Sequence, residues 1–279
     1  MTFREAYAFG EAELRAVGID DANVDAWYLL EFVTGISRAM YFMKMMDQMN
    51  SEDEKKYVEY INIRKNHIPL QHITGVQEFM GFEFFVNEHV LVPRQDTEVL
   101  VETVLEEMKP EADVLDMCVG SGCIILSLAR LGKGVRGTGV DISEEALKVA
   151  TKNREKLAVD VALIQSDLFE NVQGQFDVIV SNPPYIRTAV IEELKEEVKF
   201  HDPYIALDGK EDGLHFYRKI VDESRRFLKQ NGKLYFEIGH DQGEDVKNLM
   251  EEAGFTNVRV KKDLAGLDRV VLGVYNIIG

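Results

Sequence analysis

The chain has 279 residues, 46% of them hydrophobic, which is enough to build one domain of ordinary size and a smaller one. Its 32 basic and 49 acidic residues leave a formal charge of −17, which repels a phosphate backbone and disfavours duplex DNA as a partner. No apolar run is long enough to cross a bilayer and no signal-peptide pattern opens the chain, so we expect a cytoplasmic protein without a membrane partner.

Residues 1–70 have a helical pattern and predict a small bundle of helices. Capping-box matches over residues 2–5 and 51–54 predict two helix starts, and Gly18 predicts a stop. A further helix is expected from Asp21, because Val24, Trp27 and Tyr28 recur at helical spacing.

Five methionines lie close together in this helical segment. A methionine-rich surface can adapt to a protein partner, but we favour a place in the core of the bundle. The residues are Met40, Met43, Met45, Met46 and Met49.

Residues 71–93 change to a strand-like pattern. Two short strands are expected at 82–86 and 90–92, with a turn at 87–89 between them. This segment therefore predicts a β-hairpin that links the helical bundle to the rest of the chain.

From residue 94 to residue 279, helical and apolar stretches alternate, which is typical of an α/β fold with a doubly wound parallel sheet. The expected strands are 114–118, 135–140, 161–164, 176–181 and 233–238, and the expected helices are 99–108, 124–131, 144–157, 214–229 and 244–253. The tail adds apolar stretches at 258–261 and 269–275 without a helix between them, so an antiparallel hairpin is expected at the edge of the sheet.

A glycine-containing turn follows the first strand of this sheet. Asp116 lies at the end of the strand, and Gly120 and Gly122 precede the next helix, so the backbone there can approach a bound cofactor closely. A dinucleotide fingerprint would need Gly or Ala at the position of Ile125, whose branched side chain would crowd the helix against the strand, so NAD and FAD are disfavoured. No P-loop sequence occurs.

The chain has only two cysteines, Cys118 and Cys123, and both fall in this turn and the start of its helix. A disulfide there would distort the backbone, so we expect reduced thiols that act as small packing residues. The six histidines show no metal-ligand spacing, and no metal is expected.

Two further strands end on a carboxylate. Asp141 follows the second strand at about the separation at which an acidic residue binds ribose hydroxyls, and it comes too early to cap the next helix, which Ser143 is expected to do. Asp167 follows the third strand. Together with Asp116, these side chains predict an adenosine-containing ligand along the sheet edge, and S-adenosylmethionine fits best because it carries no phosphate.

The fourth strand runs into Asn182-Pro183-Pro184-Tyr185. A strand cannot continue through two prolines, so the chain must turn at the carboxyl edge of the sheet. The Asn182 side-chain oxygen and the Pro183 carbonyl can both accept hydrogen bonds from one amino group, while the Tyr185 ring can pack on its flat face. Such a site suits methyl transfer to nitrogen, although an Asn-Pro pair alone is often only a turn.

With these pieces the chain resembles the PrmC/HemK family, the methyltransferases that modify the glutamine of the Gly-Gly-Gln motif in peptide-chain release factors. The resemblance extends along nearly the whole chain. Besides the glycine turn and Asn182-Pro183-Pro184-Tyr185, it is carried by residues 91–98, Asp202-Pro203, 206–209, 212–214, 237–239 and Gln242-Gly243. The family usually has Pro-Glu at Gln95-Asp96, Glu at Asp202 and Gly at Lys210, which leaves the local loop geometry open.

The resemblance implies a class I S-adenosylmethionine-dependent methyltransferase fold in residues 94–279 and a substrate-recognition role for the bundle of residues 1–70. It implies methylation of the glutamine side-chain nitrogen, N5, in a release factor. The catalytic candidates are Asn182, Pro183 and Tyr185, and the substrate-binding candidates add Pro184. The cofactor-binding candidates are Asp116, Gly120, Gly122, Asp141, Asp167 and Asn182.

Two other functions stay open. The same Asn-Pro-Pro-Tyr tetrapeptide is the signature of DNA adenine-N6 methyltransferases, whose target amino group resembles a glutamine amide. A third possibility is a protein that binds cofactor or partner without turnover.

The roles of three acidic or basic residues stay unassigned. Arg94 and Glu98 are spaced as a helical surface pair, and the resemblance suggests that their loop covers the methyl-donor pocket. Glu237 ends a strand and is left out of the catalytic list, as is His201, which is expected in a surface loop.

Overall fold

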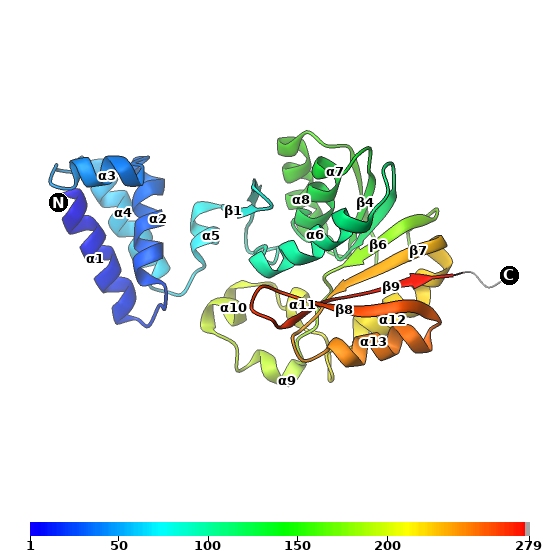
Figure 1. Ribbon diagram of the computed structural model, residues 1–279. Coiled ribbons are helices and arrows are strands. Elements are labelled where there is room, and N and C mark those ends of the chain that lie inside the picture. The colour runs from blue at the N-terminus through cyan, green and yellow to red at the C-terminus, as the bar shows by residue number, and fades with distance from the viewer. Residues whose placement is uncertain (277–279) are drawn as a thin grey trace. The chain divides into compact units, whose positions relative to one another are not determined.

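The computed structural model describes residues 1–276, and it divides the chain into two compact units (Figure 1). The first unit comprises Met1–Val76 together with Glu196–His201, and the second comprises the remaining residues. Within the described residues, no helix is long and apolar enough to span a membrane.

The first unit is a helical bundle of α1 (Phe3–Ala16), α2 (Ala22–Thr34), α3 (Arg38–Lys44), α4 (Ser51–Arg64) and α5 (Leu70–Thr74), joined by α10 (Glu196–His201). The capping box at Thr2 is confirmed, because its side chain accepts from Glu5 N while the Glu5 side chain accepts from Thr2 N. The second predicted capping box, over residues 51–54, is wrong, because Ser51 is not the N-cap residue. Asn50 caps α4 instead, with its side-chain oxygen accepting from the backbone N–H groups of Glu52 and Asp53.

The apolar stripes predicted for this unit are only partly buried. Trp27 is buried, whereas Val24 and Tyr28 are exposed, because α2 also buries Ala26, Leu29 and Leu30 on its inner face. Among the five methionines, Met49 is buried and Met40 and Met45 pack against the core. The core assignment is wrong for Met43 and Met46, which are 73% and 67% exposed.

The predicted hairpin exists, and its strand at 82–86 is confirmed at Phe82–Phe85, but that strand pairs with an earlier stretch of the chain instead of a later one. Strand β1 (Val76–Phe79) pairs with β2 (Phe82–Phe85) across a turn at Met80 and Gly81, which both have positive φ. The strand expected at residues 90–92 is wrong, because that stretch is irregular and buries Val90 and Val92 without pairing to a strand.

The second unit is built on a seven-stranded sheet in the order β5-β4-β3-β6-β7-β9-β8. The strands are β3 (Asp113–Met117), β4 (Arg136–Asp141), β5 (Val161–Gln165), β6 (Phe176–Ser181), β7 (Leu228–Glu237), β8 (Phe255–Lys262) and β9 (Asp268–Tyr275). The first five are parallel, and β9 pairs antiparallel with both β7 and β8, which confirms the predicted sheet and its antiparallel edge.

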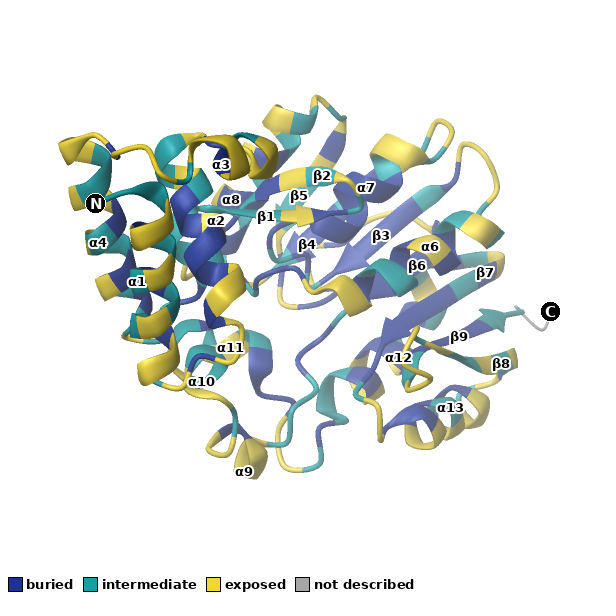
Figure 2. Ribbon diagram, turned by 60° about the vertical axis from the view of Figure 1, so that its left-hand side comes forward, coloured by how far each residue is buried: buried dark blue, intermediate teal, exposed yellow. Residues whose placement is uncertain are grey.

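Helices cover both faces of this sheet. On one face lie α6 (Glu98–Glu107), which follows the short helix η1 (Gln95–Thr97), then α7 (Cys123–Leu131) and α8 (Glu144–Leu157). On the other lie α12 (His215–Phe227) and α13 (Gly243–Glu252). Because both faces are covered, β3 and β6 are buried along most of their length (Figure 2).

Chain order reverses at β3, whose neighbours β4 and β6 carry the chain to opposite sides. Open α/β sheets bind ligands at such a reversal, outside the carboxyl ends of the strands. Between β6 and α12 the chain forms three short helices, α9 (Thr188–Ile191), α10 and α11 (Tyr204–Leu207).

Candidate active site

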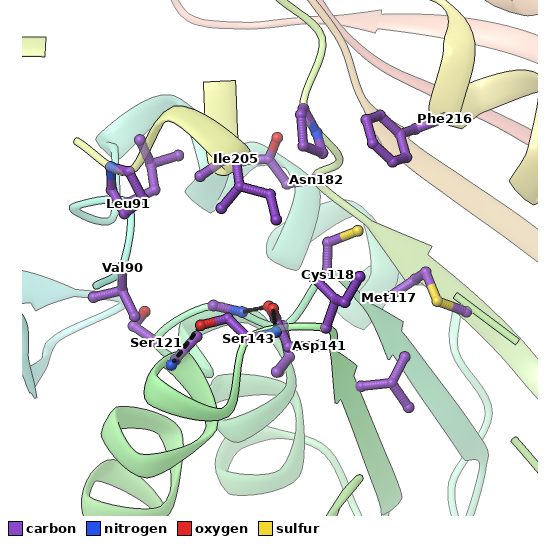
Figure 3. A pocket seen from close by; sticks show the side chains of 18 of the residues that line it. Val90, Leu91, Met117, Cys118, Ser121, Asp141, Ser143, Asn182, Ile205 and Phe216 are labelled. Atoms are coloured by element: carbon purple, nitrogen blue, oxygen red, sulfur yellow. Dashed lines mark hydrogen bonds between the residues drawn. The ribbon is translucent and has the colours of Figure 1, made fainter. Parts of the chain in front are cut away.

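A cavity of about 330 Å³ lies at the carboxyl ends of the parallel strands (Figure 3). The ends of β3, β4, β5 and β6 contribute Met117, Asp141, Asp167 and Asn182 to its lining. Asp141 and Ser143 lie on one side of the cavity, and Asn182 and Phe216 lie on the opposite side. Its volume falls at the low end of the roughly 300–1,000 Å³ typical of small-molecule sites.

The glycine turn lets the backbone line this cavity. Gly120 and Gly122 have φ of 52° and 82°, and a Cβ atom on Gly122 would lie 2.8 Å from Cδ1 of Leu126. Gly120 lines the cavity, as do its neighbours Val119 and Ser121, whereas Gly122 does not belong to the lining and leaves room for Leu126 on α7 and Ala150 on α8. The turn therefore needs both glycines, for different reasons.

Asp141 holds this turn in place. Its Oδ2 accepts a hydrogen bond of 2.9 Å from Gly120 N, and its Oδ1 accepts one of 2.9 Å from Ser143 N. Burial raises the pKa of Asp141, while the hydrogen bonds from backbone N–H groups oppose that shift. Ser143 caps α8 by accepting from Ala146 N, as predicted.

The two other strand-end carboxylates differ in their surroundings. Asp167 is exposed and lines the cavity. Asp116 is fully buried and does not line it, because Oδ2 accepts from Ile125 N at 3.2 Å in the first turn of α7. Burial raises the pKa of Asp116 well above its ordinary value, and its Oδ1 has no hydrogen-bond partner within residues 1–276.

The tetrapeptide after β6 reaches the cavity through Asn182 and Pro184. Pro183 is buried, and neither it nor Tyr185 belongs to the lining. The Tyr185 carbonyl accepts from Gln242 Nε2 at 3.0 Å, which fixes the backbone that follows the two prolines. Burial raises the pKa of the Tyr185 phenol, so it stays protonated at neutral pH.

Glu237 ends β7 next to this tetrapeptide. The side chain is 2% exposed, and burial raises its pKa to about 7, although hydrogen bonds from Thr97 and Asn182 and the charge of Arg269 oppose the shift. Asp96 raises the pKa further. The carboxyl therefore changes its charge near neutral pH, which an ordinary glutamate does not.

Arg94 and Glu98 do not form the surface pair that their spacing predicts. Arg94 donates through Nη2 to Asp202 Oδ2 at 2.6 Å and lines the cavity. Glu98 accepts from Met80 N at 2.6 Å, which ties α6 to the hairpin turn. The surface loop expected for His201 is wrong, because His201 is half-buried and ends α10 in the first unit.

Several lining residues have no counterpart among the predicted site residues. His215 and Phe216 come from the start of α12, and Pro203 and Ile205 come from the segment around α11. Pro203 belongs to the motif Asp202-Pro203, and Ile205, His215 and Phe216 follow the motif residues 202–203 and 212–214, so this proximity was the available signal.

The two cysteines are free thiols, as predicted. Burial raises the pKa of Cys123 to about 12 and that of Cys118 further, so neither is a thiolate at neutral pH. Within residues 1–276, no group of His, Cys, Asp and Glu side chains is arranged to hold a metal ion.

Comparison with known proteins shows similarity along the chain. Residues 5–75 match the family model of the PrmC N-terminal domain, and residues 94–198 match that of the methyltransferase small domain. A release factor glutamine methyltransferase from Clostridium acetobutylicum is 42% identical over 257 residues, which is 90% of this chain and 90% of that protein. One from Caulobacter vibrioides is 38% identical and covers 99% of this chain and 97% of that protein.

Solved structures share the fold at lower identity. A methyltransferase from Pyrococcus furiosus superimposes with a TM-score of 0.55 at 17% identity, over 82% of this chain and 100% of that one. The T. thermophilus 16S rRNA N2 G1207 methyltransferase, in complex with AdoMet and guanosine, gives a TM-score of 0.51 at 20% identity, over 72% of this chain and 50% of that one. The predicted methyltransferase fold is thereby confirmed.

Proposed function

Since the chain belongs to the release factor glutamine methyltransferase family, we propose that it methylates the side-chain amide nitrogen, N5, of a glutamine in peptide-chain release factors. The target is the glutamine of the Gly-Gly-Gln motif, and the methyl donor is S-adenosylmethionine. The observation that carries the proposal is 42% identity over 90% of both chains to a relative of that name. Release factors act in the cytoplasm, so the protein is placed there as well.

The residues around the cavity fit S-adenosylmethionine. A carboxylate at the end of β4, Asp141, and an exposed one after β5, Asp167, offer acceptors for hydroxyl and amino groups. Gly120 brings backbone to the cavity wall, and apolar side chains such as Ile142, Leu168 and Phe216 can cover the flat faces of a base. Asp116 and Gly122 act behind the wall by holding the start of α7.

When bound, S-adenosylmethionine supplies an electrophilic methyl group on its sulfonium. An amide nitrogen is a weak nucleophile, so the protein must orient the target NH2 group and favour positive charge on the nitrogen. The Asn182 side-chain oxygen, which lines the cavity, is assigned as an acceptor for that group. Pro183 and Tyr185 do not belong to the lining, and we assign the Pro183 carbonyl as a second acceptor and the Tyr185 ring as support for the amide plane. A dedicated base is unnecessary, because the amide proton becomes acidic only as the N–C bond forms and then leaves to water.

The bundle of the first unit is proposed to recognise the release factor, and the hairpin of β1 and β2 to link it to the methyltransferase domain. The exposed side chains of Phe42 and Met43 on α3, and of Met46 in the turn after it, offer apolar surface for a protein partner. We therefore propose the substrate-recognition role for residues 1–70 and the chemistry for residues 94–279.

The test is to incubate the purified protein with methyl-labelled S-adenosylmethionine and one of three acceptors. These are a release factor, the same factor with its Gly-Gly-Gln glutamine replaced, and duplex DNA. Peptide mass spectrometry then locates the label. Label only on the glutamine of the intact factor supports the proposal.

Label on adenine in the DNA would replace it with adenine-N6 methylation, which the charge of −17 disfavours. Absence of label on all three acceptors, with S-adenosylmethionine bound, would overturn the proposal and indicate another substrate or a protein without turnover.

A further inference from the structure

Resting on the proposed function, we propose that Glu237 is a positioning residue, which holds the Asn182 side-chain amide with its oxygen toward the target NH2 group. Glu237 does not line the cavity, so it acts through Asn182 rather than on the substrate. No catalytic role was assigned to it from the sequence.

The sheet register places the two residues side by side. Strands β6 and β7 run parallel, with Ser181 opposite Phe236, and the next residues on the two strands are Asn182 and Glu237. The end of β7 is held firmly, because the Glu237 carbonyl accepts from the Tyr217 hydroxyl at 2.9 Å. The Asn182 side-chain amide is close enough to the Glu237 carboxyl to oppose the rise in its pKa.

An ionised Glu237 permits only one useful orientation of the Asn182 amide. A carboxylate only accepts hydrogen bonds, so the NH2 group of Asn182 must face it, and the amide oxygen then faces away toward the substrate side. In the flipped orientation two acceptors would meet at Glu237 and two donors would meet at the target glutamine. Because Glu237 is buried, a mismatch at its carboxyl is costly.

A protonated Glu237 removes this selection. Its O–H group can donate to the Asn182 oxygen, so the flipped amide becomes acceptable as well. The productive orientation is therefore favoured above the pKa of Glu237, which burial raises to about 7.

Other titratable groups around Glu237 influence its protonation state. Arg269 on β9 and Asp96 in η1 are charged, and Arg269 pairs with Asp96 and Asp263 at 3.0 Å each. The remaining titratable neighbours are Tyr185, Tyr217 and Cys123, whose pKa values burial raises, so they stay neutral. One oxygen of Glu237, Oε2, has no hydrogen-bond partner among residues 1–276, which leaves this carboxyl able to hold a proton.

The first measurement follows the Asn182 side-chain amide by NMR in the protein without substrate. With ¹⁵N label, the Asn182 NH2 resonances are expected to titrate with a midpoint near pH 7 in the unsubstituted protein and to lose this titration in Glu237→Gln. A Glu107→Gln variant is the matched control, because Glu107 also contacts β7, through Tyr235 and Lys233, at the opposite end of the sheet. An Asn182 amide that does not titrate, or that titrates unchanged in Glu237→Gln, overturns the inference.

The second measurement is the pH profile of release factor methylation. Because a protonated Glu237 permits both amide orientations, we expect kcat to fall below pH 7 and to level off at a value roughly two- to fivefold lower. Glu237→Gln is expected to lose this step and to keep that lower kcat at pH 8.5 as well. KM for the release factor and Kd for S-adenosylmethionine should change by less than about threefold, and Glu237→Asp should keep a pH step. A loss in KM or Kd as large as that in kcat overturns the positioning role.

These two measurements separate the inference from the proposed function. A protein that fails to methylate the release factor disproves the function, whereas the NMR titration still decides whether Glu237 orients Asn182. Methylation with no change in the pH profile of Glu237→Gln disproves the inference alone.

Discussion

Asn182 and Pro184 of the tetrapeptide line the cavity, and of these two only Asn182 has a polar side chain. We expect Asn182→Ala to lower kcat by more than about a hundredfold, because a contact that strengthens in the transition state is lost. Cofactor affinity should stay within a few-fold. Steady-state kinetics and calorimetric titration with S-adenosylmethionine test this. Equal loss of kcat and affinity would mean that Asn182 mainly shapes the pocket.

Asp141 bridges the glycine turn and the start of α8, so its loss should act on cofactor binding. We expect Asp141→Ala to weaken S-adenosylmethionine binding by about tenfold or more. The Gly120 and Ser143 N–H groups lose their hydrogen-bond acceptor, and the ligand loses the acceptor that Asp141 offers to its hydroxyl groups. The exposed Asp160→Ala serves as control. Unchanged affinity on calorimetric titration would remove the proposed ribose role.

The raised pKa of Glu237 should make the folded protein more stable at low pH than at high pH, whereas an acid with a lowered pKa in a salt bridge does the reverse. The pKa of Glu237 in the folded protein, about 7, lies above the ordinary value, so its contribution is fully present below about pH 4.5 and is lost as pH rises through 7. Glu237→Gln removes the buried charge, and we expect it to stabilise the protein by up to about 3 kcal/mol at pH 8 and little at pH 5.

Urea unfolding of both proteins at the two pH values measures this difference. An equal effect of Glu237→Gln at pH 5 and pH 8 would show that the carboxyl does not titrate between them.

At the scale of helices, Arg64 ties together three elements of the first unit. Its side chain is 4% exposed and donates to Asp25 at 2.8 Å on α2, to the Ile68 carbonyl at 3.0 Å and to Glu197 at 2.6 Å on α10. Arg64→Ala leaves two carboxylates without their partner, so we expect it to destabilise the first unit by about 3 to 5 kcal/mol.

The matched control is Arg15→Ala, which breaks the exposed pair with Glu11 and should cost well under 1 kcal/mol. Hydrogen exchange read separately for the two units distinguishes the two variants. Similar protection in both would mean that the Arg64 network contributes little.

Elements with a strong periodic pattern could be predicted from the sequence. The parallel sheet and its antiparallel edge follow from the alternating apolar stretches. The three carboxylates at strand ends follow from the residues at which these apolar stretches stop. Hairpin placement failed because Met80 and Gly81, both at positive φ, turn the chain earlier than the pattern at residues 87–89 indicates. Asn50 was missed as a cap because Ser51 offered an equally good match one residue later.

Features that depend on distant parts of the chain could not be predicted. The exposure of Met43 depends on which face of α3 meets the rest of the bundle, and that of Met46 on the path of the turn after α3. Methionine suits either a buried or an exposed position. Ile205 and Phe216 follow the motif residues 202–203 and 212–214, but proximity in sequence does not show which side chains face the cavity. Glu237 could not be predicted to lie beside Asn182, because that depends on the register between β6 and β7.

For the whole molecule, the formal charge of −17 opposes compactness by self-repulsion. We expect the melting temperature at pH 7.5 to rise by a few degrees as KCl increases from about 10 to about 300 mM, because salt screens repulsion between exposed charges. Differential scanning fluorimetry, with sucrose at matched osmolality as control, tests this. A melting temperature that falls with salt would mean that exposed ion pairs outweigh the net repulsion.

The helix α10 belongs to the first unit although its sequence lies within the second. The chain therefore passes between the units three times, after residues 76, 195 and 201, rather than once. The units are consequently not separable modules joined by a single tether. A chimera that exchanges residues 1–76 for another bundle must carry its matching segment at 196–201 as well, since otherwise Glu197 of this chain meets a helix without its arginine. Recombination at one breakpoint is thus disfavoured, and the two segments are expected to be inherited together.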